Sequence, residues 1–93
     1  MIIQFKCQET RKIWHGDRSM RFSYEMQQIA RRKLRMLNNA KQLNDLRIPP
    51  GNRLEALKGN RQDEFSIRIN KQWRICFKWL SGNAYEVGIE DYH

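Results

Sequence analysis

The sequence predicts one small α+β domain in which helices cover one face of a mainly antiparallel sheet. Its 93 residues suffice for a single hydrophobic core. Apolar residues recur three and four positions apart between residues 26 and 40, which is typical of an amphipathic helix. From residue 63 onward apolar and polar residues alternate, which is typical of strands joined by short turns.

The first half of the chain predicts a short strand followed by two or three helices. "IIQF", residues 2–5, is rich in β-branched and aromatic residues and predicts the strand. "QETRKIWHG", residues 8–16, predicts one or two helical turns that end at its glycine. Ser23 is a good N-cap for the amphipathic helix, and "AKQLNDLR" adds a short helical turn. "IPPG" then stops helix formation.

The second half predicts the rest of the sheet. "NRLEALKGN" predicts a strand that ends at Gly59. "DEFSIRIN", "QWRICFKWL" and "AYEVGIEDYH" predict an antiparallel meander of three strands. The apolar positions of the strands "DEFSIRIN" and "QWRICFKWL" must lie on the same face of the sheet. The numbers of any two residues that pair across these strands must therefore have an even sum. The turn between them is then most simply residues 70–72.

The third strand of the meander completes two faces. Tyr85, Val87 and Ile89 are expected on the apolar face, unless a bulge interrupts the alternation. The helices should cover that face and leave the other one open to a ligand. The open face would carry the intervening residues, which are Arg68, Arg74, Cys76, Lys78, Glu86, Glu90 and Tyr92.

The charge points to a polyanionic partner. The chain has 18 Lys and Arg against 10 Asp and Glu, a net charge of +8. Such an excess suits nucleic acid, although an acidic protein or a merely soluble basic surface would show the same charge. Residues 1–48 carry 11 basic and 4 acidic groups, whereas residues 49–93 carry 7 and 6. The positions of the few cations in the second half therefore matter most.

Cysteine usage and the N-terminus indicate a cytoplasmic protein. Cys7 and Cys76 are too few for a zinc site and are interpreted as packing residues. "MIIQFKCQ" contains no apolar stretch long enough for a signal peptide or a membrane span. Reduced thiols and no membrane contact are expected.

Three motifs resemble one known family. "GNRLEALKGNR", "SIRINKQWRICFKW" and the terminal "EDYH" resemble the HigB toxins of the RelE superfamily, in particular the GraT-like branch. The resemblance covers nearly the whole chain, and "NxxWRIxF" followed by a terminal "DYH" is its specific part. It implies a single RelE-like domain over residues 1–93 and the toxin of a type II toxin–antitoxin system. Such toxins are ribosome-dependent endoribonucleases that cleave mRNA in the A site, and an antitoxin with a helix-turn-helix domain silences them.

The chemistry of RNA cleavage agrees with this resemblance. A metal-free reaction requires the 2′-OH to attack the adjacent phosphorus, an acid and a base to move protons, and cations to stabilise the phosphorane. The sequence shows no cluster of carboxylates of the kind that binds magnesium. Neither a metal nor another cofactor is therefore expected.

Arg74 and Lys58 are the strongest catalytic candidates. Arg74 is expected on the open face, where its planar fork suits two phosphate oxygens, and the resemblance places the family's essential arginine there. Lys58 precedes a glycine at a strand end and matches the family's catalytic lysine. Arg74 could instead form an ion pair with Glu86 or Glu90 across the sheet. Lys58 could instead be a solvated lysine in a turn.

Tyr92 and His93 match the family's terminal pair. The histidine can exchange protons near neutral pH, and the tyrosine can stack on a base or bond a phosphate oxygen. A terminal histidine is otherwise more often a frayed chain end. Glu55 stands where some relatives carry a histidine, and its alternation, opposite to that of Lys58, predicts that it points away from the site. The identity of the general base is therefore left open.

Further cations are predicted to bind RNA phosphates. Arg68 could hold a flanking phosphate, and Lys78 shares its face. Arg31, Arg32 and Arg35 should lie off the apolar stripe of the long helix and dock on ribosomal RNA. A solvated helix face explains the three arginines equally well.

Two functional hypotheses follow. In the first, the chain is a toxin, monomeric when free, that cleaves mRNA on the 70S ribosome and is bound by a HigA-like antitoxin. In the second, it is a non-catalytic basic module that binds RNA or the ribosome and blocks translation without cleavage. A DNA-binding regulator is a weaker third, because no DNA-reading motif is visible.

Overall fold

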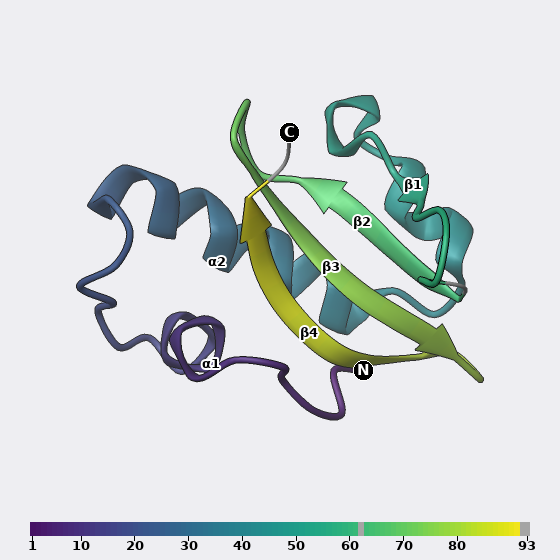
Figure 1. Cartoon of the computed structure of the whole chain (residues 1–93), viewed down its shortest axis with the longest axis horizontal. Helices are drawn as coiled ribbons and strands as arrows, with labels where there is room; N and C mark the ends of the chain where they lie inside the picture. Colours follow the sequence, from purple (N-terminus) through teal and green to yellow (C-terminus); the bar gives the residue numbers. More distant parts are fainter. Residues whose placement is uncertain (62, 92–93) are drawn as a thin grey trace.

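The computed structural model describes residues 1–61 and 63–91 and confirms the α+β prediction. The elements follow the chain in the order α1 (Gln8–Trp14), α2 (Tyr24–Asn39), the 3-10 turns η1 (Leu43–Arg47) and η2 (Pro50–Asn52), β1 (Glu55–Ala56), β2 (Glu64–Arg68), β3 (Trp73–Leu80) and β4 (Asn83–Asp91). The strands form one antiparallel sheet in the order β1-β2-β3-β4, with α2 behind it (Figure 1).

The helices begin and end where the sequence predicts. Ser23 accepts a hydrogen bond from the backbone N–H of Met26 and so caps α2. The residue that follows the C-cap of α1, Gly16, has a φ of +86°, a conformation that glycine adopts without strain. None of the helices in residues 1–61 and 63–91 combines the length and the apolar character that a membrane span requires.

The predicted pairing of β2 with β3 is confirmed. Phe65 pairs with Phe77 and Ile67 with Ile75, so the paired numbers have an even sum. Ile67, Ile75 and Phe77 are fully buried against the helices. Each such side chain contributes about 2 kcal/mol of hydrophobic free energy, which fixes this register against a slip by one residue.

A bulge in β4 makes the prediction for Tyr85 wrong. The register between β3 and β4 shifts between Cys76 and Lys78, and Lys78 pairs with Tyr85. Glu86 is the extra residue, with a φ of 50°. Tyr85 therefore lies on the face away from the core, and fully buried Ala84 takes the inner position.

The two short strands predicted at residues 2–5 and 52–59 are less regular than expected. Residues 2–5 make only two isolated parallel bridges to β4, from Ile2 to Ala84 and from Phe5 to Val87. The bulge lies between these bridges and interrupts the edge of β4. β1 spans two residues only. Two residues before it, Arg53 has a φ of 45°, which is not strand backbone, and beyond it one more bond runs from the Leu57 N–H to the carbonyl of Glu64.

Candidate active site

Arg74 is held flat against the sheet on the face opposite the core. Its Nε donates to Ser66 Oγ at 2.7 Å, and its Nη2 donates to the carbonyl oxygens of Arg53 at 2.5 Å and of Ser66 at 3.3 Å. Glu55 Oε2 lies 4.0 Å from the same Nη2. Only 3% of Arg74 is exposed. The guanidinium is thus a fixed, buried cation.

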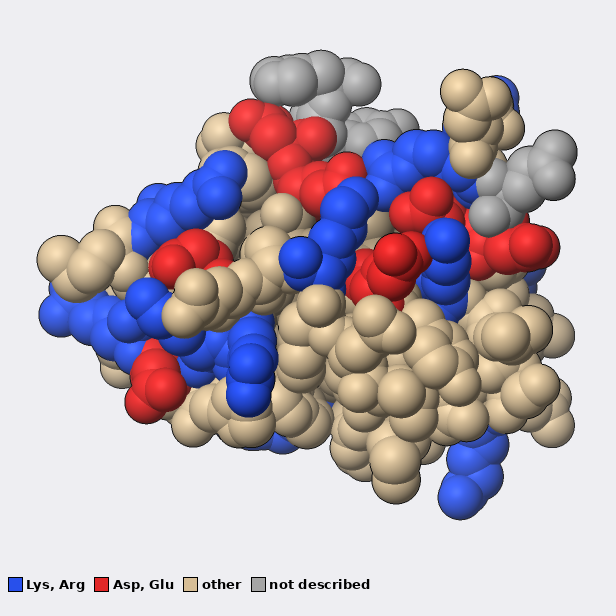
Figure 2. All heavy atoms as spheres, turned by 60° about the horizontal axis from the view of Figure 1, so that its bottom comes forward, with Lys and Arg blue, Asp and Glu red and all other residues tan. Residues whose placement is uncertain are grey.

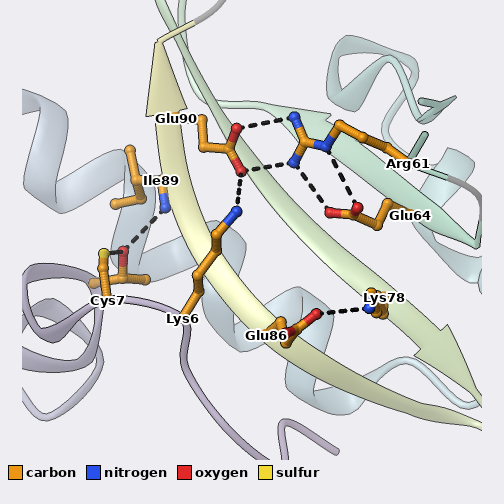
Figure 3. A network of polar contacts seen from close by, with 9 residues as sticks. Lys6, Cys7, Arg61, Glu64, Lys78, Glu86, Ile89 and Glu90 are labelled. Atoms are coloured by element: carbon orange, nitrogen blue, oxygen red, sulfur yellow. Dashed lines mark hydrogen bonds and ion pairs between the residues drawn. The ribbon is translucent and has the colours of Figure 1, made fainter. Parts of the chain in front are cut away.

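The face around Arg74 is narrower than the open face that the sequence predicts. Ser66, Arg74 and Cys76 are all buried, so the prediction is wrong for the centre of this face. The side chains of Arg61 and Lys6 reach Glu90 over the sheet and cover its middle (Figure 3). The stem of Lys6 also packs on β4, since a Cβ built on Gly88 would lie 3.3 Å from Lys6 Cβ.

An ion network ties the segment before β2 to β4. Arg61 Nη1 and Nη2 donate to the two carboxylate oxygens of Glu90 at 3.0 and 2.8 Å, and Nη2 also reaches Glu64 at 3.0 Å. Lys6 Nζ lies 3.6 Å from Glu90 (Figure 3). Burial opposes ionisation of Glu90, but the Arg61 hydrogen bonds and the two positive charges hold its pKa below the usual value.

The thiol of Cys76 lies next to this network. Burial first, and the negative charge of Glu90 second, raise the pKa of Cys76 to about 11. The thiol is therefore protonated at neutral pH and is a poor nucleophile. This agrees with its interpretation as a packing residue.

Two hollows share Arg74 as a wall. The first, called the Lys58 hollow, has a volume of about 280 Å³ and is lined by Leu57, Lys58, Arg61, Ser66, Arg74, Cys76, Glu90 and Asp91. The second, called the Arg68 hollow, has a volume of about 290 Å³ and is lined by Arg53, Glu55, Arg68, Asn70, Lys71 and Arg74. A polyanionic chain such as RNA could therefore extend from one hollow to the other across Arg74.

The structure brings two of the predicted catalytic residues together. Lys58 is exposed and lines the first hollow with Arg74. Among the residues that the structure describes, the ammonium of Lys58 has no hydrogen-bond or ion-pair partner, so it is available to an anion. Tyr92 and His93 lie outside the described residues, and their predicted roles stay predictions.

The expectation that Glu55 points away from the site is wrong. Glu55 lies beside Arg74 and lines the Arg68 hollow. It also borders a larger depression together with Lys58. The expectation extended strand alternation from Glu55 to Lys58, but β1 ends at Ala56 and the alternation ends with it.

The predicted RNA-binding residues separate into three groups. Arg68 lines the hollow named after it, and its Nε donates to the Asn70 carbonyl at 3.1 Å. Lys78 forms an ion pair with Glu86 at 2.9 Å and lines neither hollow. The helix arginines, the third group, lie on α2, away from both hollows.

The prediction of three solvent-facing helix arginines is correct for two of them. Arg32 and Arg35 are exposed. Arg31 is half-buried, and its Nε donates to the carbonyl of Ile13 at 2.9 Å. This carbonyl lies in the last turn of α1 and also accepts from the backbone N–H of Gly16 at 3.1 Å, so the bond from Arg31 joins the two helices. On the side of α1 and the start of α2, basic side chains outnumber acidic ones (Figure 2).

Three residues of the site escaped the sequence analysis. Arg61 lies in an irregular segment, where periodicity assigns no face, and the carbonyl of Arg53 carries no sequence signal. Ser66 could have been found, because the confirmed register places it on the same face as Arg74. Lys33 was also missed: it is buried in α2, with Nζ bonded to Asn52 Oδ1.

Comparisons of the sequence with known proteins place this chain in a family. The family model described as "RelE-like toxin of type II toxin-antitoxin system HigB" matches residues 4–93. "Toxin HigB-1" of Vibrio cholerae serotype O1 is 37% identical over 91 residues, which cover 97% of this chain and 96% of that toxin. "Endoribonuclease HigB" of Proteus vulgaris is 44% identical over 41 residues, 44% of this chain and 45% of that protein. Because the family model spans almost the whole sequence, the chain belongs to the HigB toxins of type II toxin–antitoxin systems, within the RelE-like fold.

Proposed function

We propose that this toxin is an endoribonuclease that cleaves mRNA in the A site of the ribosome. The name of the Proteus vulgaris relative, an endoribonuclease, supports nuclease activity. The observation that carries the proposal is the meeting of two different cations at one hollow. Arg74 is fixed and buried, whereas Lys58 is exposed and able to approach a bound strand.

This pair of cations suits the transition state of RNA cleavage. The 2′-oxygen attacks the adjacent phosphorus, the bond from phosphorus to the 5′-oxygen breaks, and the products are a 2′,3′-cyclic phosphate and a 5′-hydroxyl. Negative charge grows on the phosphorane oxygens as the two bonds exchange. Side chains alone can supply the charge and the proton transfers, so we propose a metal-independent reaction.

Each residue then has a distinct role. Arg74 is already oriented by Ser66 and Arg53, so it can stabilise the developing charge without reorganisation. Lys58 supplies a second positive charge. His93 transfers a proton as acid or base, and Tyr92 positions the substrate. Glu55 is a second candidate for the general base, since it lies beside Arg74.

The ribosome is proposed to bring the substrate into this geometry. An oriented strand reacts much faster than a free one, so the isolated chain should cleave mRNA only weakly. The net charge of +8 favours attraction to ribosomal RNA, and exposed Arg32 and Arg35 are proposed to contact its phosphates. Membership of a type II system implies a cognate antitoxin. We propose that it is HigA-like, with a helix-turn-helix domain, and that the free toxin is a monomer.

Primer extension on mRNA tests the function. Purified 70S ribosomes carry a message with a defined codon in the A site, and the toxin is added with or without ribosomes. The expected result is cleavage within that codon only when ribosomes are present. A chain without His93 and an Arg74→Ala variant should not cleave the message. The folded fraction of each variant is measured, so that loss of activity is not mistaken for loss of fold.

One observation favours the non-catalytic alternative. Arg74 is almost fully buried and bonded to Ser66 and Arg53, as a purely structural arginine would be. A chain with that role would bind ribosomes and block translation without cutting the message. Toxin that co-sediments with ribosomes and leaves full-length mRNA would support this alternative over the nuclease.

A further inference from the structure

The two hollows beside Arg74 differ in how their cations are neutralised. In the Lys58 hollow, Arg61 donates hydrogen bonds to both Glu64 and Glu90. Its charge is therefore offset by two carboxylates within the protein. The other cations that line this hollow are Lys58 and Arg74.

The Arg68 hollow contains cations without such partners. Its lining includes Arg53, Arg68, Lys71 and Arg74 but one carboxylate, that of Glu55, which lies 4.0 Å from Arg74. Across residues 1–61 and 63–91, no carboxylate forms an ion pair with the other three cations. A hollow with this excess of positive charge favours a bound anion.

The backbone holds these cations at the hollow. The carbonyl of Arg53 accepts a hydrogen bond from Arg74. Arg68 Nε donates to the carbonyl of Asn70. Asn70 Oδ1 in turn accepts from the backbone N–H groups of residues 72 and 73, both at 2.8 Å, and so shapes the turn that carries Lys71. The guanidinium groups of Arg68 and Arg74 are therefore oriented before a ligand binds, which lowers the entropic cost of binding.

We propose that the Arg68 hollow is a second phosphate subsite, which binds the RNA phosphate next to the one that is cleaved. This inference rests on the proposed function for the identity of the strand. Arg74 lines both hollows, so a strand whose reacting phosphate lies at Arg74 and Lys58 delivers its neighbouring phosphate to Arg53, Arg68 and Lys71. Guanidinium and ammonium groups bind phosphate oxygens through short charge-assisted hydrogen bonds.

The test measures binding without cleavage. The probe is a fluorescent single-stranded oligodeoxynucleotide, which lacks the 2′-hydroxyl and stays intact. Its affinity for the full-length chain is titrated at several salt concentrations. The variant Arg68→Gln/Lys71→Gln removes two charges from the hollow, and Arg11→Gln/Arg47→Gln removes two exposed charges elsewhere as the matched control. Lys71→Gln alone guards against misfolding, because Lys71 is exposed in a turn.

The subsite variant should bind the probe roughly tenfold more weakly than wild type, and the single variant should show part of this loss. For the subsite variant, the slope of log affinity against log salt concentration should be smaller in magnitude than that of the control variant by about 0.7. This is the value for one phosphate contact on a single strand. Equal losses in the subsite and control variants would overturn the inference, as would failure of the wild type to bind. Equal weakening of poly-glutamate binding would also overturn it, because charge alone would then explain the loss.

The two proposals can fail separately. If wild-type chain binds the probe through the Arg68 hollow but never cleaves mRNA on ribosomes, the subsite holds and the nuclease proposal fails. If the chain cleaves mRNA but the subsite variant matches the control in probe binding, the nuclease proposal holds and the subsite fails.

Discussion

Replacing Arg74 by alanine is expected to destabilise the fold as well as to stop the reaction. The side chain donates three hydrogen bonds to Ser66 and Arg53 in a position that is almost fully shielded from water. Alanine would leave the hydroxyl of Ser66 and the carbonyl of Arg53 without this donor. Loss of activity in this variant would therefore have two causes.

The size of the effect follows from these bonds. Hydrogen bonds from a charged donor contribute about 1.5–3 kcal/mol each. The unfavourable desolvation of a buried guanidinium offsets part of their sum, which leaves a net cost of roughly 2–4 kcal/mol on truncation. One kcal/mol lowers Tm by about 4–8 °C in a domain of this size, so Tm should fall by roughly 10–25 °C.

Thermal melts followed by circular dichroism measure this change. Arg68→Ala is the matched control, because Arg68 is only half-buried and makes one side-chain hydrogen bond. Its Tm should fall by no more than about 5 °C. An Arg74→Ala variant that melts within about 3 °C of wild type would show that the three bonds contribute almost nothing to stability.

Three further predictions concern the polar groups of the fold. Because the pKa of Glu90 is lowered below 4.5, its carboxylate contributes stability that is complete above about pH 4.5 and is lost as the pH falls through the lower, folded-state value. Urea titrations should show that Glu90→Gln loses less stability than wild type on acidification, and parallel losses would contradict this. Asn52→Ala should cost about 2–4 kcal/mol in the same titrations, because it leaves the buried amine of Lys33 and the carbonyl of Leu46 unpaired. A cost below about 1 kcal/mol would show that water replaces Asn52. At pH 8, a thiol whose pKa is about 11 is ionised in roughly one molecule in a thousand, so iodoacetamide should modify Cys76 at least a hundredfold more slowly in the folded than in the unfolded chain. Equal rates by mass spectrometry would place Cys76 outside the buried site.

The regular parts of the fold could be predicted from the sequence, because strong periodicity dictates them. The alternation in β2 and β3 determined their register, since a slip by one residue would expose Ile67, Ile75 and Phe77. The cap at Ser23 likewise located the start of α2. These features depend on neighbours in the sequence and on burial of one face.

The irregular parts could not be predicted, because tertiary contacts decide them. The bulge at Glu86 moved Tyr85 off the apolar face, and no local pattern indicates where an extra residue is inserted. The pairing of Glu55 with Ser66 places Glu55 on the face of Arg74, and the early end of β1 frees Lys58 from the alternation that would place it on the opposite face. Arg61 pairs with Glu64, three residues along the chain, and also with Glu90 on the distant strand β4. The candidate site is built largely from such irregular parts, so the sequence indicates Arg74, Lys58 and Arg68 but neither Arg61 nor the groups that hold Arg74 in place.

The most direct test of the site mutates Lys58 rather than Arg74. Lys58 is exposed and, within the described part of the chain, has no side-chain partner, so its replacement should leave the fold intact. The measurement is the single-turnover rate of mRNA cleavage on 70S ribosomes by wild type, Lys58→Met and Lys58→Arg, with Tm recorded for each. We expect Lys58→Met to cleave at least about 100-fold more slowly than wild type at unchanged Tm, and Lys58→Arg to recover part of the rate. Cleavage by Lys58→Met at the wild-type rate would contradict the placement of the catalytic site in the Lys58 hollow.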